Sequence, residues 1–539
     1  MRRQIIISAL RRMACGLGLV GAVCLPWTAA AVTAEQAQLL AEGDGDERVA
    51  VVMQLAASPV AADHALVRAL ADEAVQVQGN QVLVVQDGIS RDAVTGQTVT
   101  PNEQAEDLVV NNRLRAALDT ALAGMDVFTD DPVRQYEAAL VLQRGALDDP
   151  TPAQLPLVER ALSQADRLTA SARDALLLAQ AALHLGSDEA AQRTAAARKL
   201  AQVHQPMVKT LLAQRLEVET DPAVQTALKQ ALTQVERALS ISAVLGELFT
   251  GMSLGSILLL AALGLAITYG LMGVINMAHG ELIMIGAYAT YVVQGVFQKY
   301  LPGAFDWYLL AALPTAFLAS ALVGAAMERS VIRFLYGRPL ETLLATWGLS
   351  LVLMQAVRSL FGAQNVGVEN PSWMSGGITL LGGLTLPWNR ILIVAFAAVV
   401  LLAVALLIGK TRLGLFVRGV TQNRPIASCM GVNTARIDTY AFALGSGIAG
   451  LAGCALSQVG NVGPDLGQNY IVDSFMVGVL GGVGQLAGTV YAALGLGILN
   501  KFLEGWAGAV LAKIAVLVFI IVFIQKRPQG IFALKGRQA

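Results

Sequence analysis

Charged residues are scarce in this chain of 539 residues. Asp, Glu, Lys and Arg make up 14% of the sequence, whereas an ordinary soluble domain carries about 25%. The scarcity is uneven. Residues 32–237 are rich in Asp, Glu, Arg and Gln, whereas residues 244–525 are almost continuously apolar. This shift in composition predicts a boundary near residue 240 between a polar part and a part with membrane character.

Signatures of catalysis and of nucleic-acid binding are missing. The net charge is −1, and the four cysteines give no disulfide framework. Gly409-Lys410-Thr411 imitates the end of a phosphate-binding loop, but Val404 stands where that loop requires its first glycine. We therefore expect no cofactor, no bound metal, no nucleic-acid partner and no enzymatic activity. Any ATP must be hydrolysed by a separate protein.

The first 31 residues have the composition of a secretory signal. A basic start with four arginines precedes a short apolar run at 13–25, and Ala29-Ala30-Ala31 offers a cleavage site. We predict that residues 1–31 are a cleaved signal peptide, with a retained anchor as the alternative. In either case the following segment, 32–240, is exported.

Residues 32–240 have mostly helical periodicity. Asp131-Pro132 and Asp221-Pro222 are helix-start signals, and the segments that follow them are similar, which favours stacked helix pairs. A β-hairpin is predicted where VQVQ and QVLVVQ flank Gly79-Asn80. We expect an exported, mostly helical soluble domain without a catalytic cluster.

Residues 241–530 contain apolar runs long enough to cross a bilayer, which takes about 20 residues of helix. The candidate spans are 247–269, 279–298, 307–327, 342–361, 389–409, 438–458 and 508–525. The stretch 470–500 is apolar but interrupted by glycines, so it forms either two short crossings or a re-entrant pair of half-helices. The sequence predicts an all-α, polytopic membrane protein, with residues 531–539 as a cytoplasmic tail.

Gly481, Gly482 and Gly484 interrupt that stretch. Non-helical backbone at membrane depth is tolerated only inside protein or beside a watery cavity, so these glycines are candidates for a translocation path. Close packing of helices through small residues is the alternative.

Three polar residues, Asn276, His279 and Glu281, enter the apolar zone at the start of a span. Polar groups are costly there and usually functional, which makes these three residues candidates for the same path. Glu281 alone is also explained by a favourable charge in the first turn of a helix.

Lys and Arg cluster in loops 329–338 and 410–437 and after residue 526, so these segments are predicted to be cytoplasmic. In loop 410–437, Thr421 or Asn423 can cap a short helix, and Gly431 can close it in a left-handed conformation. Such a helix suits docking of an ATPase, whereas a basic loop that only fixes topology is the alternative. The candidate docking residues are Gln422, Asn423, Arg424, Gly431, Asn433 and Arg436.

Residues 247–537 resemble the permeases of branched-chain amino-acid ABC transporters. The resembling motifs are INMAHGELIMIGAY, GVNTARIDTYAFALGSGIAGLAG, VLGGVGQLAGT and KRPQGIF. Finer features resemble the urea-importing branch of that family: YGRPLETLLATWGLSL, FGAQNVGVENPSWMSGG, RGVTQNRPIASCMGV and NVGPDLGQNY. The exported domain also looks like the extended form of the urea-type permease.

The resemblance implies a subunit of an importer in the bacterial inner membrane. Its implied partners are a second homologous permease, two cytoplasmic ATPases and a periplasmic substrate-binding protein. It maps the docking loop onto 421–436 and the family signature onto Asn276, His279, Gly280 and Glu281. Urea, a small neutral substrate, is favoured. A branched-chain amino-acid or short-chain amide importer and a passive urea channel are the alternatives.

The export signal and the basic loops predict the same topology, with residues 32–240 in the periplasm. A reporter that is active only in the cytoplasm, fused at Gln154, should therefore be silent. A fusion after Lys526 serves as the positive control. Strong activity at Gln154 contradicts the predicted topology.

Overall fold

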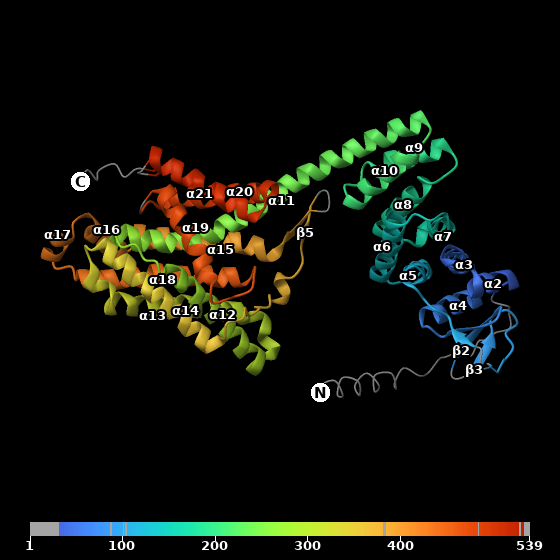
Figure 1. Cartoon of the computed structure of the whole chain (residues 1–539), viewed down its shortest axis with the longest axis horizontal. Helices are drawn as coiled ribbons and strands as arrows, with labels where there is room; N and C mark the ends of the chain where they lie inside the picture. The colour runs from blue at the N-terminus through green and yellow to red at the C-terminus, as the bar shows by residue number, and fades with distance from the viewer. Residues whose placement is uncertain are drawn as a thin grey trace. The chain divides into compact units, whose positions relative to one another are not determined.

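The computed structural model describes residues 32–86, 89–100, 102, 105–380, 384–482, 484–527 and 530–532, apart from a few side chains. The chain divides into two compact units, 1–239 and 240–539 (Figure 1). The predicted signal peptide and most of the predicted tail lie outside the described residues.

The N-terminal unit is mainly helical. Its helices are α2 (Ala34–Glu42), α3 (Gly45–Ala57), α4 (Ala61–Ala71), α5 (Asn112–Asp126), α6 (Pro132–Asp148), α7 (Leu155–Ser163), α8 (Ala170–His184), α9 (Ala190–Leu200) and α10 (Pro206–Val218). Asp131 accepts a hydrogen bond from Val133 N at 3.0 Å, and Asp221 accepts one from Ala223 N at 2.8 Å. Both predicted helix starts are confirmed, because these aspartates cap the exposed N–H groups.

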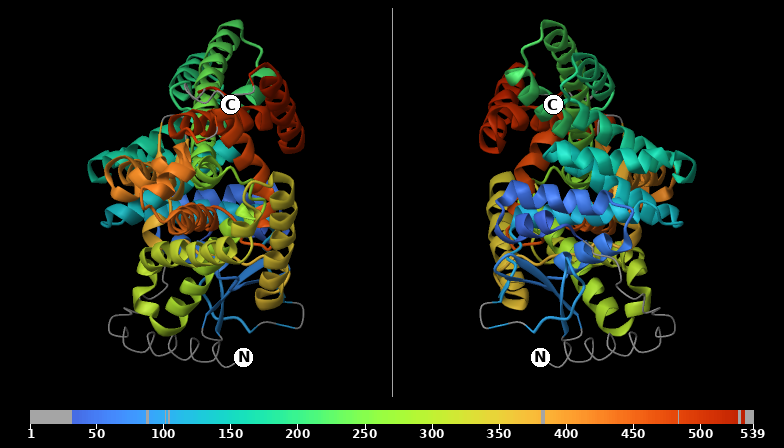
Figure 2. Two further views of the ribbon diagram at one scale, coloured as in Figure 1. Left: turned by 90° about the vertical axis from the view of Figure 1, so that its left-hand side faces the viewer. Right: turned by 90° about the vertical axis from the view of Figure 1, so that its right-hand side faces the viewer.

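A four-stranded antiparallel sheet interrupts these helices. Its strands are β1 (Val75–Gln78), β2 (Gln81–Gln86), β3 (Ile89–Asp92) and β4 (Glu106–Asp107), in the order β3-β2-β1-β4. The predicted hairpin is present: Gln78 pairs with Gln81, and Gly79 has φ +58°. Figure 2 shows the sheet beside the first helices of the unit, and α2 and α4 both contact β2.

Successive helices of this unit pack on one another. Contacts join α3 to α5, α5 to α6, α6 to α8 and α8 to α9, as stacked helix pairs require. The core is largely alanine and leucine, with Leu118, Leu142 and Leu176 almost fully buried. Small alanines let neighbouring helix axes approach closely.

One ion cluster lies buried at the end of α10. The Glu219 carboxylate is 1% exposed and binds Arg193 through two hydrogen bonds of 2.9 and 3.0 Å and Arg215 through one of 3.1 Å. Burial raises the pKa of Glu219, but hydrogen bonds from Arg193, the Asp221 backbone and Arg215 outweigh it and lower the pKa to about 2. The cluster fixes α9 and α10 to the start of the next helix.

The second unit begins within a long helix, α11 (Pro222–Met272), which continues across the division between the units. The remaining helices are α12 (His279–Tyr300), α13 (Tyr308–Ser330), α14 (Pro339–Phe361), α15 (Trp388–Lys410), α16 (Arg412–Gln422), α17 (Arg424–Cys429), α18 (Thr434–Ser457), α19 (Leu466–Gly481), α20 (Leu486–Ala507) and α21 (Ala509–Lys526). Short 3-10 turns join some of them, and strands β5 (Gly377–Thr379) and β6 (Thr385–Pro387) form a hairpin.

Eight helices in the described part of the chain are long and apolar enough to cross a membrane. The glycine-interrupted stretch 470–500 forms two helices, α19 and α20. α19 has 16 residues and spans roughly 24 Å, less than the ~30 Å hydrocarbon core. The structure is the predicted polytopic, predominantly helical protein.

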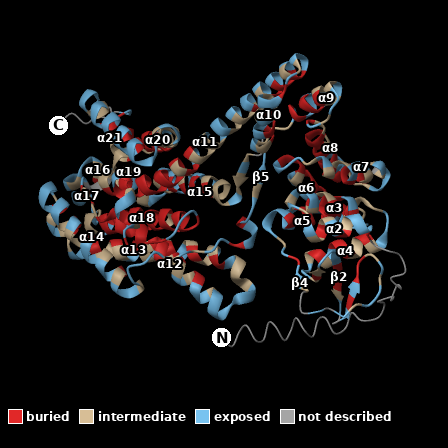
Figure 3. Cartoon of the chain, turned by 45° about the vertical axis from the view of Figure 1, so that its right-hand side comes forward, coloured by how far each residue is buried: buried red, intermediate tan, exposed pale blue. Residues whose placement is uncertain are grey.

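Helix α18 forms the centre of this unit. Its apolar window is 78% buried, against 22% for α14 and α15 and 17% for α21. Figure 3 shows buried residues concentrated along α18 and exposed residues along α21. Close packing requires glycine: a Cβ on Gly286 would lie 2.2 Å from Gly450 O, and one on Gly453 would lie 1.9 Å from Ile283 O. The exposed apolar faces of the outer helices suit contact with lipid.

The Glu219 cluster makes the N-terminal unit sensitive to acid. Because the folded pKa of about 2 lies below the ordinary value of 4.5, the ion cluster stabilises the fold fully above pH 4.5 and progressively less as the pH falls towards 2. Glu219→Gln should cost about 3–5 kcal/mol near neutral pH and flatten this dependence. Hydrogen exchange of α9 and α10 in the whole chain between pH 2 and 6, corrected for intrinsic rates, measures it.

Glu236→Gln is the matched control, because Glu236 is half-exposed and pairs with Lys209 at 3.1 Å. Exposed pairs contribute little, so this variant should exchange like the parent. Equal protection in the Glu219 and Glu236 variants would contradict the stabilising role of the buried cluster.

Candidate functional site

The chain between α11 and α12 is non-helical, and it lies well inside the helical bundle. Residues 273–276 have no regular structure. His279 Nε2 donates to Ala261 O at 2.9 Å, roughly three turns before the end of α11. Met277 N donates to the Thr346 hydroxyl at 3.1 Å, about two turns into α14. The segment therefore packs against α11 and α14, and α12 begins at His279, so the three polar residues lie at the start of a span as predicted.

Asn276, His279 and Glu281 all lie at this break and are at most 1% exposed, with His279 bound to α11 and Glu281 bound to α14. Each side chain has one atom held by the protein. Asn276 Oδ1 accepts from Ala278 N at 3.0 Å, and Glu281 Oε1 accepts from Ser350 Oγ at 2.9 Å. The other atoms, Asn276 Nδ2, His279 Nδ1 and Glu281 Oε2, have no hydrogen-bond partner in the structure. Buried polar atoms without partners are rare and costly, which marks the break as a site.

Helix α14 supplies the facing side of the break through residues that the sequence analysis missed. Thr342, Thr346 and Ser350 are each at most 5% exposed, although most of α14 is exposed. They recur at every fourth position and therefore share one helical face. Three hydroxyls with this spacing in an apolar span were the available sequence signal.

Of the predicted glycines, Gly481 ends α19, and Gly482 and Gly484 lie in the turn before α20. Gly482 and Gly484 have φ of +95° and +76°, which favours glycine. A Cβ on Gly481 would lie 2.6 Å from Gly488 C, and one on Gly270 would lie 2.7 Å from Gly484 Cα. The nearest neighbours of Gly481 and Gly484 are thus backbone atoms rather than polar side chains, which is the geometry of close packing.

The short helix predicted in loop 410–437 is present as α17. Asn423 Oδ1 caps it by accepting from Ile426 N at 3.1 Å, whereas the Thr421 hydroxyl donates to Val417 O instead. Gly431 follows with φ +83°, and Asn433 caps α18 by accepting from Arg436 N at 3.1 Å. Gln422 and Arg436 are exposed, as are the apolar Ile426 and Met430. α17 therefore presents an exposed apolar surface on a basic segment.

Two buried carboxylates lie next to this segment, and one of them, Asp438, fixes it to the bundle. Arg424 pairs with Asp438 of α18, and its guanidinium lies 4.7 Å from the centroid of the Tyr336 ring. Glu328 of α13 accepts from the Thr439 hydroxyl at 2.7 Å and pairs with Arg333 at 3.3 Å. Both carboxyl groups are at most 1% exposed. Arg424, predicted to dock a partner, is thus bound to α18 within the chain.

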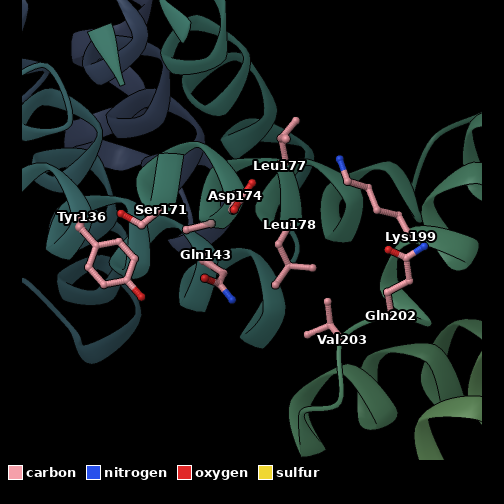
Figure 4. Close-up of a pocket in the computed structure, with 10 residues that line it drawn as sticks. Tyr136, Gln143, Ser171, Asp174, Leu177, Leu178, Lys199, Gln202 and Val203 are labelled. Carbon is pink, nitrogen blue, oxygen red and sulfur yellow. The ribbon is translucent and has the colours of Figure 1, made fainter. Parts of the chain in front are cut away.

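The N-terminal unit has a pocket of about 440 Å³ between α6, α8 and the end of α9 (Figure 4). Its lining mixes apolar with polar and charged side chains: Tyr136, Gln143, Ser171, Asp174, Ala175, Leu177, Leu178, Lys199, Gln202 and Val203. These ten residues include no nucleophile–base pair and no set of metal ligands.

A bundle of apolar helices with a polar break inside it, and a capped amphipathic helix beside it, defines a membrane transport subunit. Comparison with known families specifies the class. Residues 247–525 match the family described as the permease component of the branched-chain amino acid transport system, and the chain belongs to this family. Its members are membrane subunits of ABC importers and leave ATP hydrolysis to a separate subunit.

Similar proteins carry related names. The permease LivH of the high-affinity branched-chain amino acid transport system of Escherichia coli K12 is 29% identical over 297 residues, which are 53% of this chain and 94% of LivH. BraD of Pseudomonas aeruginosa is 27% identical over 53% of this chain and 95% of its own length. A probable LivH of Methanocaldococcus jannaschii is 26% identical over 51% and 88%. No solved structure matches significantly.

Gly431 provides a test of the α17 segment. Its φ of +83° is costly for a β-branched residue, so Gly431→Val should cost about 1–2 kcal/mol locally and distort the exit from α17. No atom lies within 4 Å of the new Cβ, so the effect comes from the backbone alone. We expect uptake to fall severalfold while membrane insertion is retained.

Gly419→Val is the matched control, because Gly419 lies within α16 with open space around it. Transport assays and membrane fractionation should show parental behaviour for this variant. Normal uptake by Gly431→Val would contradict a functional role for the segment.

Proposed function

We propose that this chain is the permease subunit of an ATP-driven importer, and that solute crosses beside the break between α11 and α12. The observation that carries this proposal is the group of three buried, unpartnered polar atoms at Asn276, His279 and Glu281. Polar groups inside a membrane bundle are usually retained for transport. Gly481, Gly482 and Gly484 then support the path indirectly, because they allow α19 and α20 to pack closely.

ATP hydrolysis is coupled to the path through α17. A partner ATPase docks on the exposed face of α17 and its flanking residues, and Arg424 transmits the movement to Asp438 at the start of α18. Helix α18 in turn contacts α12 and α13 along their length. The Ser320 hydroxyl of α13 donates to Leu282 O at 2.8 Å, directly after the polar break. This chain of contacts gives the docked ATPase a mechanical route to the site.

The basic loops 329–338 and 410–437 and the signal-like start of the chain support the following arrangement in the membrane. The N-terminal unit lies in the periplasm and the C-terminal end in the cytoplasm of a bacterium. When α19 is counted as a span in addition to the eight longer helices, the number of spans is odd. An odd number supports N-terminal and C-terminal ends on opposite sides of the membrane. A second homologous permease, two ATPases and a periplasmic binding protein complete the importer.

Two substrate classes are supported by different observations. The names of the similar proteins favour branched-chain amino acids. A zwitterionic amino acid has an ammonium group that suits the Glu281 carboxylate. Its own carboxylate suits the N-terminal end of α12, because helix N-termini favour anionic groups. This is the better-supported candidate.

Urea is the second candidate. It is favoured by the resemblance of segments 336–377 and 418–431 to the urea-importing branch. Urea carries no net charge, so its binding depends on hydrogen bonds, and the Asn276 amide offers donors for that purpose. Short-chain amides have the same requirement.

Uptake in a deletion strain distinguishes these candidates. Cells with and without the gene should be given labelled leucine and labelled urea at low concentration. We expect gene-dependent uptake that requires ATP and a binding protein. Loss of leucine uptake alone identifies an amino-acid importer, and loss of urea uptake alone identifies a urea importer. Uptake that persists without ATP would contradict an ABC importer and indicate a passive channel.

A further inference from the structure

The pocket of the N-terminal unit is lined by one face of α6, one face of α8 and the end of α9 (Figure 4). Tyr136 and Gln143 lie about two turns apart on α6 and therefore share a face. Asp174 and Leu178 lie about one turn apart on α8 and share a face in the same way. Because α6 contacts α8 and α8 contacts α9, helix packing brings these faces together around one concave surface.

Gln143 is a buried polar side chain without a partner in this pocket. It is 9% exposed and lines the pocket, and its amide makes no hydrogen bond to any described residue. Gln135, which is also buried on α6, is fully used: its Nε2 donates to Arg167 O at 3.0 Å, and its Oε1 accepts from Thr169 N at 2.7 Å. Buried polar groups are rarely left unpaired, so the free Gln143 amide indicates a ligand with both a donor and an acceptor.

Asp174 and Lys199 add opposite charges to the lining. Neither side chain forms an ion pair or a hydrogen bond with the part of the chain that the structure describes. Partial burial lowers the pKa of Lys199, and the negative charge of Asp174 opposes this shift, so the two charges lie within electrostatic range of one another. Figure 4 shows Leu178 and Val203 between Gln143 and Lys199, which gives the pocket apolar surface beside its polar groups.

The size and the chemistry of the pocket favour a peptide. Its volume of about 440 Å³ lies within the roughly 300–1,000 Å³ of sites for organic ligands, and a water molecule takes only about 30 Å³ in the liquid. A solute as small as urea would leave most of this space to water. A side-chain amide complements the N–H and C=O groups of a peptide backbone. Stacked helix pairs also present extended concave surfaces that bind other chains.

We propose that this pocket binds an extended peptide segment of a partner protein. The backbone N–H and C=O groups of the peptide bind the Gln143 amide, and an apolar side chain contacts Leu178 and Val203. A basic side chain of the peptide pairs with Asp174, and an acidic side chain pairs with Lys199. This site belongs to the N-terminal unit alone, so it is independent of the solute that the membrane unit transports.

Selection from a phage library of random peptides against the complete chain in nanodiscs tests the site. Selected peptides should combine a basic, an apolar and an acidic residue. Their dissociation constants, measured by fluorescence anisotropy, should rise by about tenfold or more for Gln143→Leu, which removes the amide. Leucine leaves no unpaired polar group there, so this variant should fold normally. Gln230→Leu, at an exposed position of α11, is the matched control and should bind like the parent.

Exchange of the two charges gives a readout that a purely structural defect would not produce. Asp174→Lys combined with Lys199→Glu should lose the selected peptides and bind peptides in which the basic and acidic residues have changed places. Asp119→Lys combined with Lys229→Glu is the matched control, because both residues are exposed and lie outside the pocket lining. This control should keep the preference of the parent.

The outcomes decide the proposal directly. Equal binding of the selected peptides to the parent and to Gln143→Leu overturns it, as does an unchanged preference after the charge exchange. A selection that enriches no peptide over a parallel selection against Gln143→Leu also overturns it. In that case, binding of labelled leucine that depends on Gln143 would identify a site for a small solute instead.

Discussion

The structure of the second unit depends on one constraint: inside a bilayer, backbone N–H and C=O groups must find partners within the protein. Regular helices meet this requirement along α11 to α15 and α18 to α21. The segment between α11 and α12 is the exception. There the Thr346 hydroxyl accepts from Met277 N, and Asn276 Oδ1 accepts from Ala278 N. Side chains replace the missing helical bonds, which lets an irregular segment persist deep in the bundle.

This replacement is possible because the neighbouring helices approach closely. Helix α18 packs against α12, α13 and α11 through glycines whose Cβ positions are filled by neighbouring backbone atoms. In lipid, association of helices depends on such packing rather than on burial of apolar surface from water. The glycines around the α19–α20 turn serve the same purpose.

Charged residues at the edge of the helical bundle form ion pairs with buried carboxylates. Arg424 bridges α17 to Asp438, and Glu328 joins α13 to Arg333 and Thr439. When the basic partner of a buried carboxylate is removed, the folded protein is strongly destabilised, because the unpaired carboxylate charge stays buried. The α17 segment is therefore attached to α18 through Arg424 and Asp438, and Glu328 separately ties α13 to Arg333 and to Thr439 of α18.

Local patterns in the sequence determined much of this protein. Apolar runs predicted the spanning helices, aspartate before proline predicted the starts of α6 and α11, and Gly79-Asn80 predicted the hairpin. Asn423 and Gly431 bounded α17 as expected. These features depend on neighbouring residues and on the solvent around them, so they can be read along the chain.

Tertiary structure decided which distant residues meet. The sequence correctly placed Asn276, His279 and Glu281 at the start of a span, but only the fold shows that Ala261, Thr346 and Ser350 contact this region. The hydroxyl stripe on α14 gained its role only by facing α12. Likewise, Arg424 was predicted as a docking residue, and the fold adds its ion pair with Asp438 of α18. Side-chain partners far apart in sequence are selected by packing, which local periodicity does not specify.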